Sequence, residues 1–326
     1  MDVFLNLIFI ILGFVLLIKG ADFLVNGSSS LAKRFNISEI AIGLTIVAMG
    51  TSAPELVVNI ISSLNGHDDV VFGNIIGSNI FNMFLILGVA GNIYPLFVQR
   101  QTVLKEIPYA ILATLVFFIL VNDKLLFEAE TNVLSFFDAI ILFVMFILFL
   151  LNVFFNMKNT GDSIGDEIEI YNSLRTTLMI IGGAVGLAIG GDLIVNNAVA
   201  VAEKFQVSKK LIGLTILAAG TSLPELATSA VAALQKKSDI AVGNIVGSNI
   251  FNILLVLSTS ALLSPMNYNS DLNIDLGVVM LGSVLLFVFM FTLKRNRLDR
   301  LEATIYLVGF VTYMVFLFMR EQTPVS

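Results

Sequence analysis

Three scarcities narrow the functions open to this sequence. It has no cysteine and one histidine, His67, and only 13% of its 326 residues are charged. The lack of cysteine excludes disulfide bonds and thiolate chemistry, and a single histidine excludes a histidine metal cluster. Soluble domains carry about 25% charged residues, so we do not expect a soluble protein. Basic residues are nowhere dense enough for a nucleic-acid-binding patch.

Apolar residues fill the chain instead, with 57% hydrophobic residues and a mean hydropathy of +0.94. Because about 20 predominantly apolar residues let a helix cross a bilayer, we predict an all-α polytopic membrane protein. Asp2 replaces the basic start of a signal peptide and no cleavage pattern follows, which favours a retained first helix. The ten candidate transmembrane helices are residues 3–26, 40–64, 70–94, 106–122, 137–156, 174–202, 210–234, 239–263, 275–293 and 303–319.

The sequence repeats itself at an offset of 170 positions. This shift superposes Gly20–Gly88 on Gly190–Ser258 without a gap, and twelve of the sixteen positions in 41–56 are identical to their copies in 211–226. Such self-similarity indicates two homologous halves. We predict a first five-helix repeat at 1–157, an acidic cytoplasmic linker at 158–173 and a second five-helix repeat at 174–326.

Five helices in each half give the halves opposite orientations in the membrane. An inverted repeat of this kind is typical of secondary transporters, whose substrate site lies near the bilayer midplane between the halves. Twelve Lys and Arg residues fall in the connectors on one side and five on the other. The positive-inside rule then predicts a multi-pass protein of the cell (inner) membrane with both termini extracytoplasmic.

Each half holds one isolated glutamate within a long apolar run. Glu55 and Glu225 are the only charged residues in 40–66 and 211–235. A charge at mid-bilayer costs a few kcal/mol or more, so each glutamate requires a compensating partner. Bound cations provide the simplest compensation. The alternative is a pair of protonated glutamates that share hydrogen bonds across a helix interface.

The residues around both glutamates favour a cation site. A proline directly before each glutamate removes a backbone donor and predicts loosened backbone at Ala48–Ser52 and Ala218–Ser222. On the next helix a serine and an asparagine four residues apart share one face, and G-x-x-x-G spacing allows close helix approach. Carbonyl, hydroxyl, amide and carboxylate oxygens together suit Ca²⁺ or Na⁺. These helix residues are Ser78 and Asn82 with copies Ser248 and Asn252, and Gly73 and Gly77 with copies Gly243 and Gly247.

With these motifs the sequence resembles the cation/calcium antiporter superfamily, and within it the prokaryotic sodium/calcium exchangers. The resemblance rests on the alpha-repeats at 43–82 and 213–252, with GTSAPE, GTSLPE and two G-N-x-x-G-S-N-x-F-N runs. It implies ten helices in inverted halves, four central ion sites, and helices one and six as the moving gate. The residues that the resemblance places around Ca²⁺ and Na⁺ are Glu55, Glu225, Thr51, Thr221, Asn82, Asn252, Ser52, Ser222, Ser78, Ser248, Ala48 and Ala218.

The expected function is an electrogenic antiporter that exchanges Na⁺ for Ca²⁺ by alternating access. Some relatives, including potassium-dependent ones, carry an acid where this chain has Asn252, which favours potassium independence. The missing G-N-A-x-E pattern of proton/calcium exchangers favours sodium coupling. The alternative is an antiporter of H⁺ and Ca²⁺, or of another divalent cation, at the same glutamates. A cation channel is a more distant possibility. We expect no cofactor, no nucleic acid and no protein partner, only the ions and the lipid bilayer.

Two aspartates also repeat at the offset of 170, Asp22 and Asp192. An intramembrane aspartyl protease would need two aspartates in helices, but Ile189–Asp192 does not match the G-x-G-D pattern of that class. We therefore predict interfacial or capping roles for Asp22 and Asp192, and a transporter rather than an enzyme.

Overall fold

A computed structural model describes residues 3–156, 169–205 and 218–322, and helices dominate them. Within these ranges eight helices are long and apolar enough to cross a membrane, or nine if the bent pair Glu39–Thr51 and Ala53–Leu64 forms one span. The predicted helical class is confirmed. The predicted segment 210–234 lies partly outside the described residues, and Leu223–Leu234 remains of it as a shorter apolar helix.

The first half begins with the long helix α1 and ends with α10. Two π-helical segments, η1 and η2, interrupt its α-helices. The elements are α1 (Val3–Phe35), α2 (Glu39–Ile42), η1 (Gly43–Val47), α3 (Ala48–Thr51), α4 (Ala53–Leu64), α5 (Asp68–Ile80), η2 (Phe81–Ile86), α6 (Leu87–Ile93), β1 (Leu96–Phe97), α7 (Arg100–Leu104), α8 (Glu106–Leu120), α9 (Asp123–Phe127), β2 (Val133–Leu134) and α10 (Phe136–Asn156).

The second half repeats much of this order. It contains a π-helical segment, η4, and a short 3₁₀ helix, η5. The elements are α11 (Ser173–Lys204), α13 (Ala218–Thr221), α14 (Leu223–Leu234), α15 (Ser238–Phe251), η4 (Asn252–Val256), α16 (Leu257–Leu263), β3 (Met266–Asn267), η5 (Ser270–Leu272), α17 (Asn273–Phe289), β4 (Arg297–Leu298) and α18 (Arg300–Gln322).

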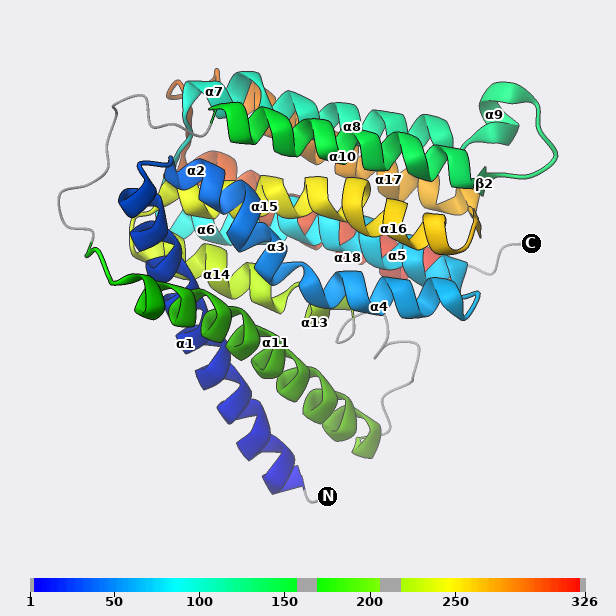
Figure 1. The fold of residues 1–326 in the computed structure, drawn as a ribbon. Coiled ribbons are helices and arrows are strands. Elements are labelled where there is room, and N and C mark those ends of the chain that lie inside the picture. Colours follow the sequence, from blue (N-terminus) through cyan, green and yellow to red (C-terminus); the bar gives the residue numbers. More distant parts are fainter. Residues whose placement is uncertain (1–2, 157–168, 206–217, 323–326) are drawn as a thin grey trace.

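Most helices lie alongside one another in a bundle, whereas α1 and α11 run obliquely below it (Figure 1). These two helices touch through glycines. A Cβ atom built on Gly20 would lie 2.8 Å from the Gly183 carbonyl oxygen, and one built on Gly13 would lie 2.8 Å from the Gly190 carbonyl oxygen. Because Gly183 and Gly190 are the offset-170 copies of Gly13 and Gly20, the contacts are reciprocal. The backbones approach this closely only because side chains are absent.

The neighbouring glycines Gly182 and Gly183 allow a matched test of this seam. A Cβ on Gly183 would meet the Leu24 amide nitrogen at 2.7 Å, whereas one on Gly182 has nothing within 4 Å. We expect Gly183→Ala to destabilise the protein by about 1–3 kcal/mol, as overpacking does. Gly182→Ala should be neutral or slightly stabilising, since alanine favours helix. Melting temperatures of the purified variants check this. Equal melting temperatures would contradict the close contact.

Two short ladders join segments from different halves of the chain. Leu96 of β1 pairs antiparallel with Leu298 of β4, and Leu134 of β2 pairs with Met266 of β3. The four strands have two residues each and were not predicted from the sequence.

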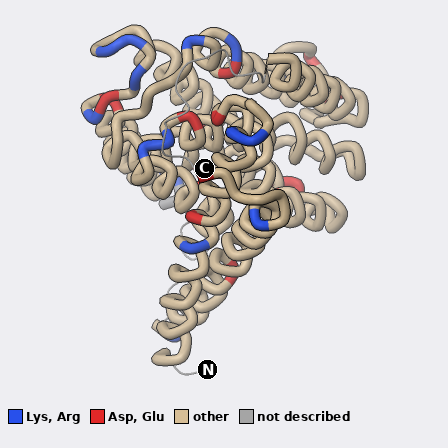
Figure 2. The backbone as a smooth tube through the Cα atoms, turned by 60° about the vertical axis from the view of Figure 1, so that its left-hand side comes forward, with Lys and Arg blue, Asp and Glu red and all other residues tan. Residues whose placement is uncertain are grey.

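The outer surface of the bundle is apolar, as a lipid-facing surface should be. Large hydrophobic side chains such as Ile11, Leu148 and Val311 are exposed on α1, α10 and α18. Charged residues gather mainly at connections and helix ends, and the helices between them are largely uncharged (Figure 2). The distribution agrees with a protein whose middle lies in the membrane.

Candidate ion site

The helix that carries Glu55 breaks three residues before it. Ser52 leaves the helical conformation with φ −85° and ψ 4°, and the chain bends by 49° between Thr51 and Ala53. Pro54 follows in the first turn of α4 and cannot donate to the Gly50 carbonyl. The loosening predicted over Ala48–Ser52 is confined to Ser52 at the end of that range, because Ala48–Thr51 remains helical as α3.

The copy in the second half breaks in the same way. Ser222 has φ −91° and ψ 5°, between α13 and α14, and Pro224 opens α14. The irregular backbone again comes just before the glutamate, here Glu225. The side chain of Ala218, a predicted site residue, is outside the described residues.

The two breaks bring both glutamates into the interior. Glu55 and Glu225 are each 1% exposed. The Ser52 hydroxyl donates to Glu225 Oε1 over 3.0 Å, so the first break touches the second carboxylate. In the described part of the chain, both oxygens of Glu55 and Oε2 of Glu225 have no hydrogen-bond partner. The ion pairs there involve Asp299 and Asp275 and neither glutamate.

Threonines beside the glutamates bind asparagines of the other half. Thr51 Oγ1 donates to Asn244 Oδ1 over 3.1 Å, and Thr221 Oγ1 donates to Asn74 Oδ1 over 3.3 Å. Thr51 is fully buried and Thr221 is half-buried. Asn74 and Asn244 are offset-170 copies of each other and were not among the predicted site residues. Their signal was available, because each is the second residue of a repeated G-N-x-x-G-S-N run.

A second reciprocal pair lies on the same helices. Asn82 Nδ2 donates to Asn249 Oδ1 over 2.9 Å, and Asn252 Nδ2 donates to Asn79 Oδ1 over 3.1 Å. Asn82 and Asn252 lie at the start of the π-helical segments η2 and η4. Such π-bulges are frequent at functional sites. The amide nitrogens of Asn82 and Asn252 are thus used in hydrogen bonds to protein. Their Oδ1 atoms have no partner among the described residues.

Three predicted serines add buried hydroxyls. Ser78, Ser222 and Ser248 are at most 2% exposed, and the hydroxyl oxygen of each has no partner in the described ranges. Buried polar groups are normally hydrogen-bonded, so this many unpartnered oxygens beside two carboxylates require an explanation. Hard oxygen donors of this kind are the ligands that Ca²⁺ and Na⁺ take, and the residues fit such ions. Among the described residues, no three or more His, Cys, Asp or Glu side chains are grouped so that they could hold a metal ion together.

Close packing brings α15 against the helix segments that precede Glu55. A Cβ on Gly43 would lie 3.1 Å from the Gly243 Cα, and one on Gly247 would lie 2.8 Å from the Ala48 Cβ. Ala48, another predicted site residue, is fully buried at this contact. The role predicted for the second G-x-x-x-G motif is confirmed for Gly243 and Gly247.

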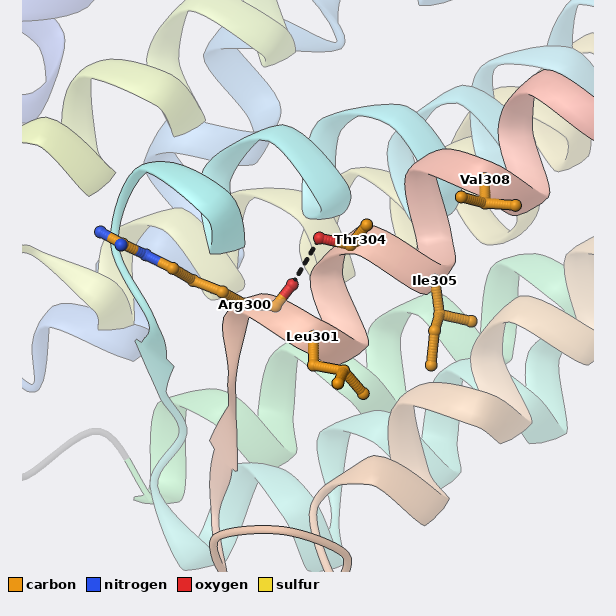
Figure 3. Close-up of a pocket in the computed structure, with 5 residues that line it drawn as sticks. All are labelled: Arg300, Leu301, Thr304, Ile305 and Val308. Carbon is orange, nitrogen blue, oxygen red and sulfur yellow. Dashed lines mark hydrogen bonds between the residues drawn. The ribbon is translucent and has the colours of Figure 1, made fainter.

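A hollow of about 420 Å³ is lined by residues of α18 and contains none of the predicted ion-site residues (Figure 3). Its lining is mostly apolar, and the Thr304 hydroxyl is bound to the Arg300 carbonyl over 2.7 Å. Its lining contains no carboxylate, so this hollow has no negative charge to balance that of a bound cation. The remaining lining residues are Leu301, Ile305 and Val308.

The chain matches a known protein family over most of its length. The profile described as sodium/calcium exchanger protein matches residues 5–155 and 175–319. The chain belongs to the sodium/calcium exchanger family. The family consists of transporters, and the exchanger contains the apolar helices that such a membrane protein needs.

Individual relatives match this exchanger over nearly the whole chain. CaxA of Alkalimonas amylolytica is 38% identical over 320 residues, which cover 95% of this chain and 98% of that protein. The sodium/calcium exchanger MaX1 of Methanosarcina acetivorans is 28% identical, covering 96% and 98%. A solved structure of the sodium-calcium exchanger NCX_Mj superposes with a TM-score of 0.82 at 29% identity, covering 97% of this chain and all of that one.

The repeated aspartates of this exchanger differ in their contacts. Asp22 Oδ1 accepts hydrogen bonds from Asn26 on its own helix, over 3.0 Å, and from Gln235 at the end of α14, over 2.7 Å. Lys237 adds a contact to Asn26 Oδ1 over 2.9 Å, and burial lowers the pKa of this lysine. Asp192 Oδ1 accepts a hydrogen bond from Asn196, on its own helix, over 2.8 Å. Asp22 therefore ties α1 to the α14–α15 connection.

Proposed function

We propose that this exchanger moves Ca²⁺ against Na⁺ at one site formed around Glu55 and Glu225. One observation carries the proposal: two almost fully buried carboxylates have no cationic side-chain partner among the described residues and lie among unpartnered oxygens. A buried charge without a partner is costly, and a bound cation removes the cost. The proposed ligands are Glu55, Glu225, Thr51, Thr221, Asn82, Asn252, Ser52, Ser222, Ser78, Ser248, Ala48 and Ala218.

The site's charge couples the two ion fluxes. Two ionised carboxylates give a formal charge of −2, which one Ca²⁺ or two Na⁺ neutralise. Either occupant relieves the buried charge, and both together would overcompensate it. Further Na⁺ at the hydroxyl and carbonyl oxygens makes the exchange electrogenic. With two acids rather than three, the site requires no K⁺.

Ten transmembrane helices in two inverted halves complete the proposed architecture. The crosswise bonds of Asn82 to Asn249 and of Asn252 to Asn79 support it, because a two-fold relation between halves generates contacts in such pairs. We assign the halves to residues 1–157 and 174–326 and the cytoplasmic linker to 158–173. The charge count supports termini on the extracytoplasmic side of an inner membrane.

We assign the alternating gate to α1 and α11. Their backbones pack closely at a seam of glycines, which favours movement of the two helices together as one unit. The bonds of Asp22 to Gln235 and of Asn26 to Lys237 tie α1 to the bundle on one face. Breaking and remaking such ties on alternate faces would expose the site to each side in turn.

Calcium uptake into proteoliposomes tests the coupling ion. An outward Na⁺ gradient should drive ⁴⁵Ca²⁺ uptake, and reversing the membrane potential should change its rate, since net charge moves. A pH gradient without Na⁺ should drive none. Uptake driven by the pH gradient alone would favour an H⁺/Ca²⁺ antiporter. Flux that continues without any counter-ion would contradict exchange altogether.

A further inference from the structure

A small polar cavity lies apart from Glu55 and Glu225, where the start of α2 meets α7, α8 and the end of α10. Its volume is about 20 Å³, enough for one water molecule or one small ion. Six of its ten lining residues are polar or charged, and all six carry an oxygen ligand. They are Ser38, Gln99, Gln101, Thr102, Glu106 and Asn156.

Two of these residues are buried without a partner. Glu106 is 4% exposed, and its Oε2 atom accepts no hydrogen bond in the described part of the chain. Thr102 is fully buried, and its Oγ1 atom likewise has no partner there. Lys105 lies next to Glu106 in sequence, but its Nζ atom donates to Asn156 Oδ1 over 2.9 Å and forms no ion pair with Glu106. A buried carboxylate oxygen in this state needs a compensating partner.

The other half shows how such an acid is compensated. Asp275, in the first turn of α17, is 3% exposed and lies one residue from the offset-170 position of Glu106, which is in the first turn of α8. It accepts two bonds of 3.0 Å from Arg320 at the end of α18, and one of 2.8 Å from Tyr313. Both arginine nitrogens donate to Oδ2 and the tyrosine donates to Oδ1, so the guanidinium charge lies directly against the carboxylate.

The position of that arginine has a counterpart in the first half. Helices α10 and α18 start alike, because Ser135 N–H donates to Asp138 and Asp299 N–H donates to Glu302. Counting eighteen residues from Asp138 reaches Asn156, and counting eighteen from Glu302 reaches Arg320. Asn156 therefore occupies the place of the arginine. It has no charge of its own to offer Glu106, and its amide oxygen accepts a hydrogen bond from Lys105.

We propose that this cavity binds one small hard cation, Na⁺ or Ca²⁺, with Glu106 as its charged ligand. The cation takes the role that Arg320 has beside Asp275. Neutral oxygens from Thr102 and Gln101, which also line the cavity, complete a ligand set of the kind both ions accept. Because the lining comes from α2, α7, α8 and α10, occupancy would stabilise the packing of these helices. The cavity shares no residue with the proposed transport site.

Ion-dependent melting of the purified full-length protein tests the proposal. The measurements use a background variant that carries both Glu55→Gln and Glu225→Gln. Ion binding at the transport site then contributes little to the change in melting temperature. Melting temperatures are compared in NaCl, CaCl₂ and choline chloride at equal ionic strength. We expect one of the two ions, at 100 times its Kd, to raise the melting temperature by about 5 °C. The NaCl and CaCl₂ arms distinguish the two cations.

Two further variants in this background decide the assignment. Glu106→Gln should abolish the ion-dependent rise, whereas Glu130→Gln, at an exposed acid, should leave it unchanged. Asn156→Arg should also abolish it, with a higher melting temperature in choline, because the guanidinium supplies the missing charge. A rise that persists in both Glu106→Gln and Asn156→Arg, or no rise in the background, would overturn the proposal and leave a cavity for water only.

Discussion

Replacing Glu55 or Glu225 with glutamine should abolish sodium-driven calcium uptake while the protein remains folded. The change keeps the side chain's shape and removes the charge that both ions need. Loss of a charged ligand should lower the rate by about 100-fold or more, beyond the 10–100-fold typical of residues that only orient a ligand. The double variant should be no slower than either single one, because residues that act as a unit are not additive.

Uptake of ⁴⁵Ca²⁺ by proteoliposomes, normalised to protein, measures this loss. Glu130→Gln serves as the control, because Glu130 is exposed and lies outside the proposed site.

The effect of Glu55→Gln and Glu225→Gln on the melting temperature should change sign when the transported ions are added. Without Na⁺ or Ca²⁺, Glu55→Gln and Glu225→Gln should melt above the parent protein, since the parent then holds two uncompensated buried charges. With Ca²⁺ the order should reverse. Near-normal uptake by either variant would refute the site.

The sequence predicted the helices well, because long apolar runs are a direct requirement of the bilayer. The errors lie where polar residues are buried by protein. Helix α1 continues to Phe35, although its predicted apolar segment ended at residue 26. The added turns include Ser28–Ser30, which are fully buried, and Ser30 contacts Thr176 over 3.3 Å. Because serine is polar, a prediction from apolar runs ends the transmembrane helix before these residues.

The strands β1–β4 and the short helix α9 were not predictable in this way. A two-residue strand is too short for the alternation that identifies a strand from sequence. Its partner is distant, as in the pairing of Leu96 with Leu298. Only the folded arrangement of the two halves brings such segments together.

The site was predictable to the extent that the repeat marks it. The repeat identified both glutamates and the irregular backbone before them. It did not distinguish which asparagines bond across the halves. Asn79 and Asn82 both lie in the repeated run, and the choice of Asn82 omitted its hydrogen-bond partner, Asn249. A single helix pattern places residues on a face, whereas a contact between halves depends on how two helices cross.

Replacing Asn252 with aspartate should make calcium transport depend on an extra monovalent cation. Asn252 is 1% exposed and donates to Asn79 Oδ1 over 3.1 Å, while its own Oδ1 has no partner among the described residues. A carboxylate there would raise the formal charge to −3, so one bound Ca²⁺ would leave −1. An uncompensated acid at mid-membrane costs about 2.5–3.5 kcal/mol, or roughly 100-fold in affinity.

We therefore expect Asn252→Asp to take up ⁴⁵Ca²⁺ about 100-fold more slowly in choline medium, and K⁺ or Na⁺ on the calcium side to restore part of the rate. The unmodified protein should respond little to K⁺. Asn252→Ala is the matched control, because it loses the same bond to Asn79 without adding a charge, and its rate should not depend on K⁺. If both variants respond alike to K⁺, the added charge does not reach the ions, and Asn252 lies outside their site.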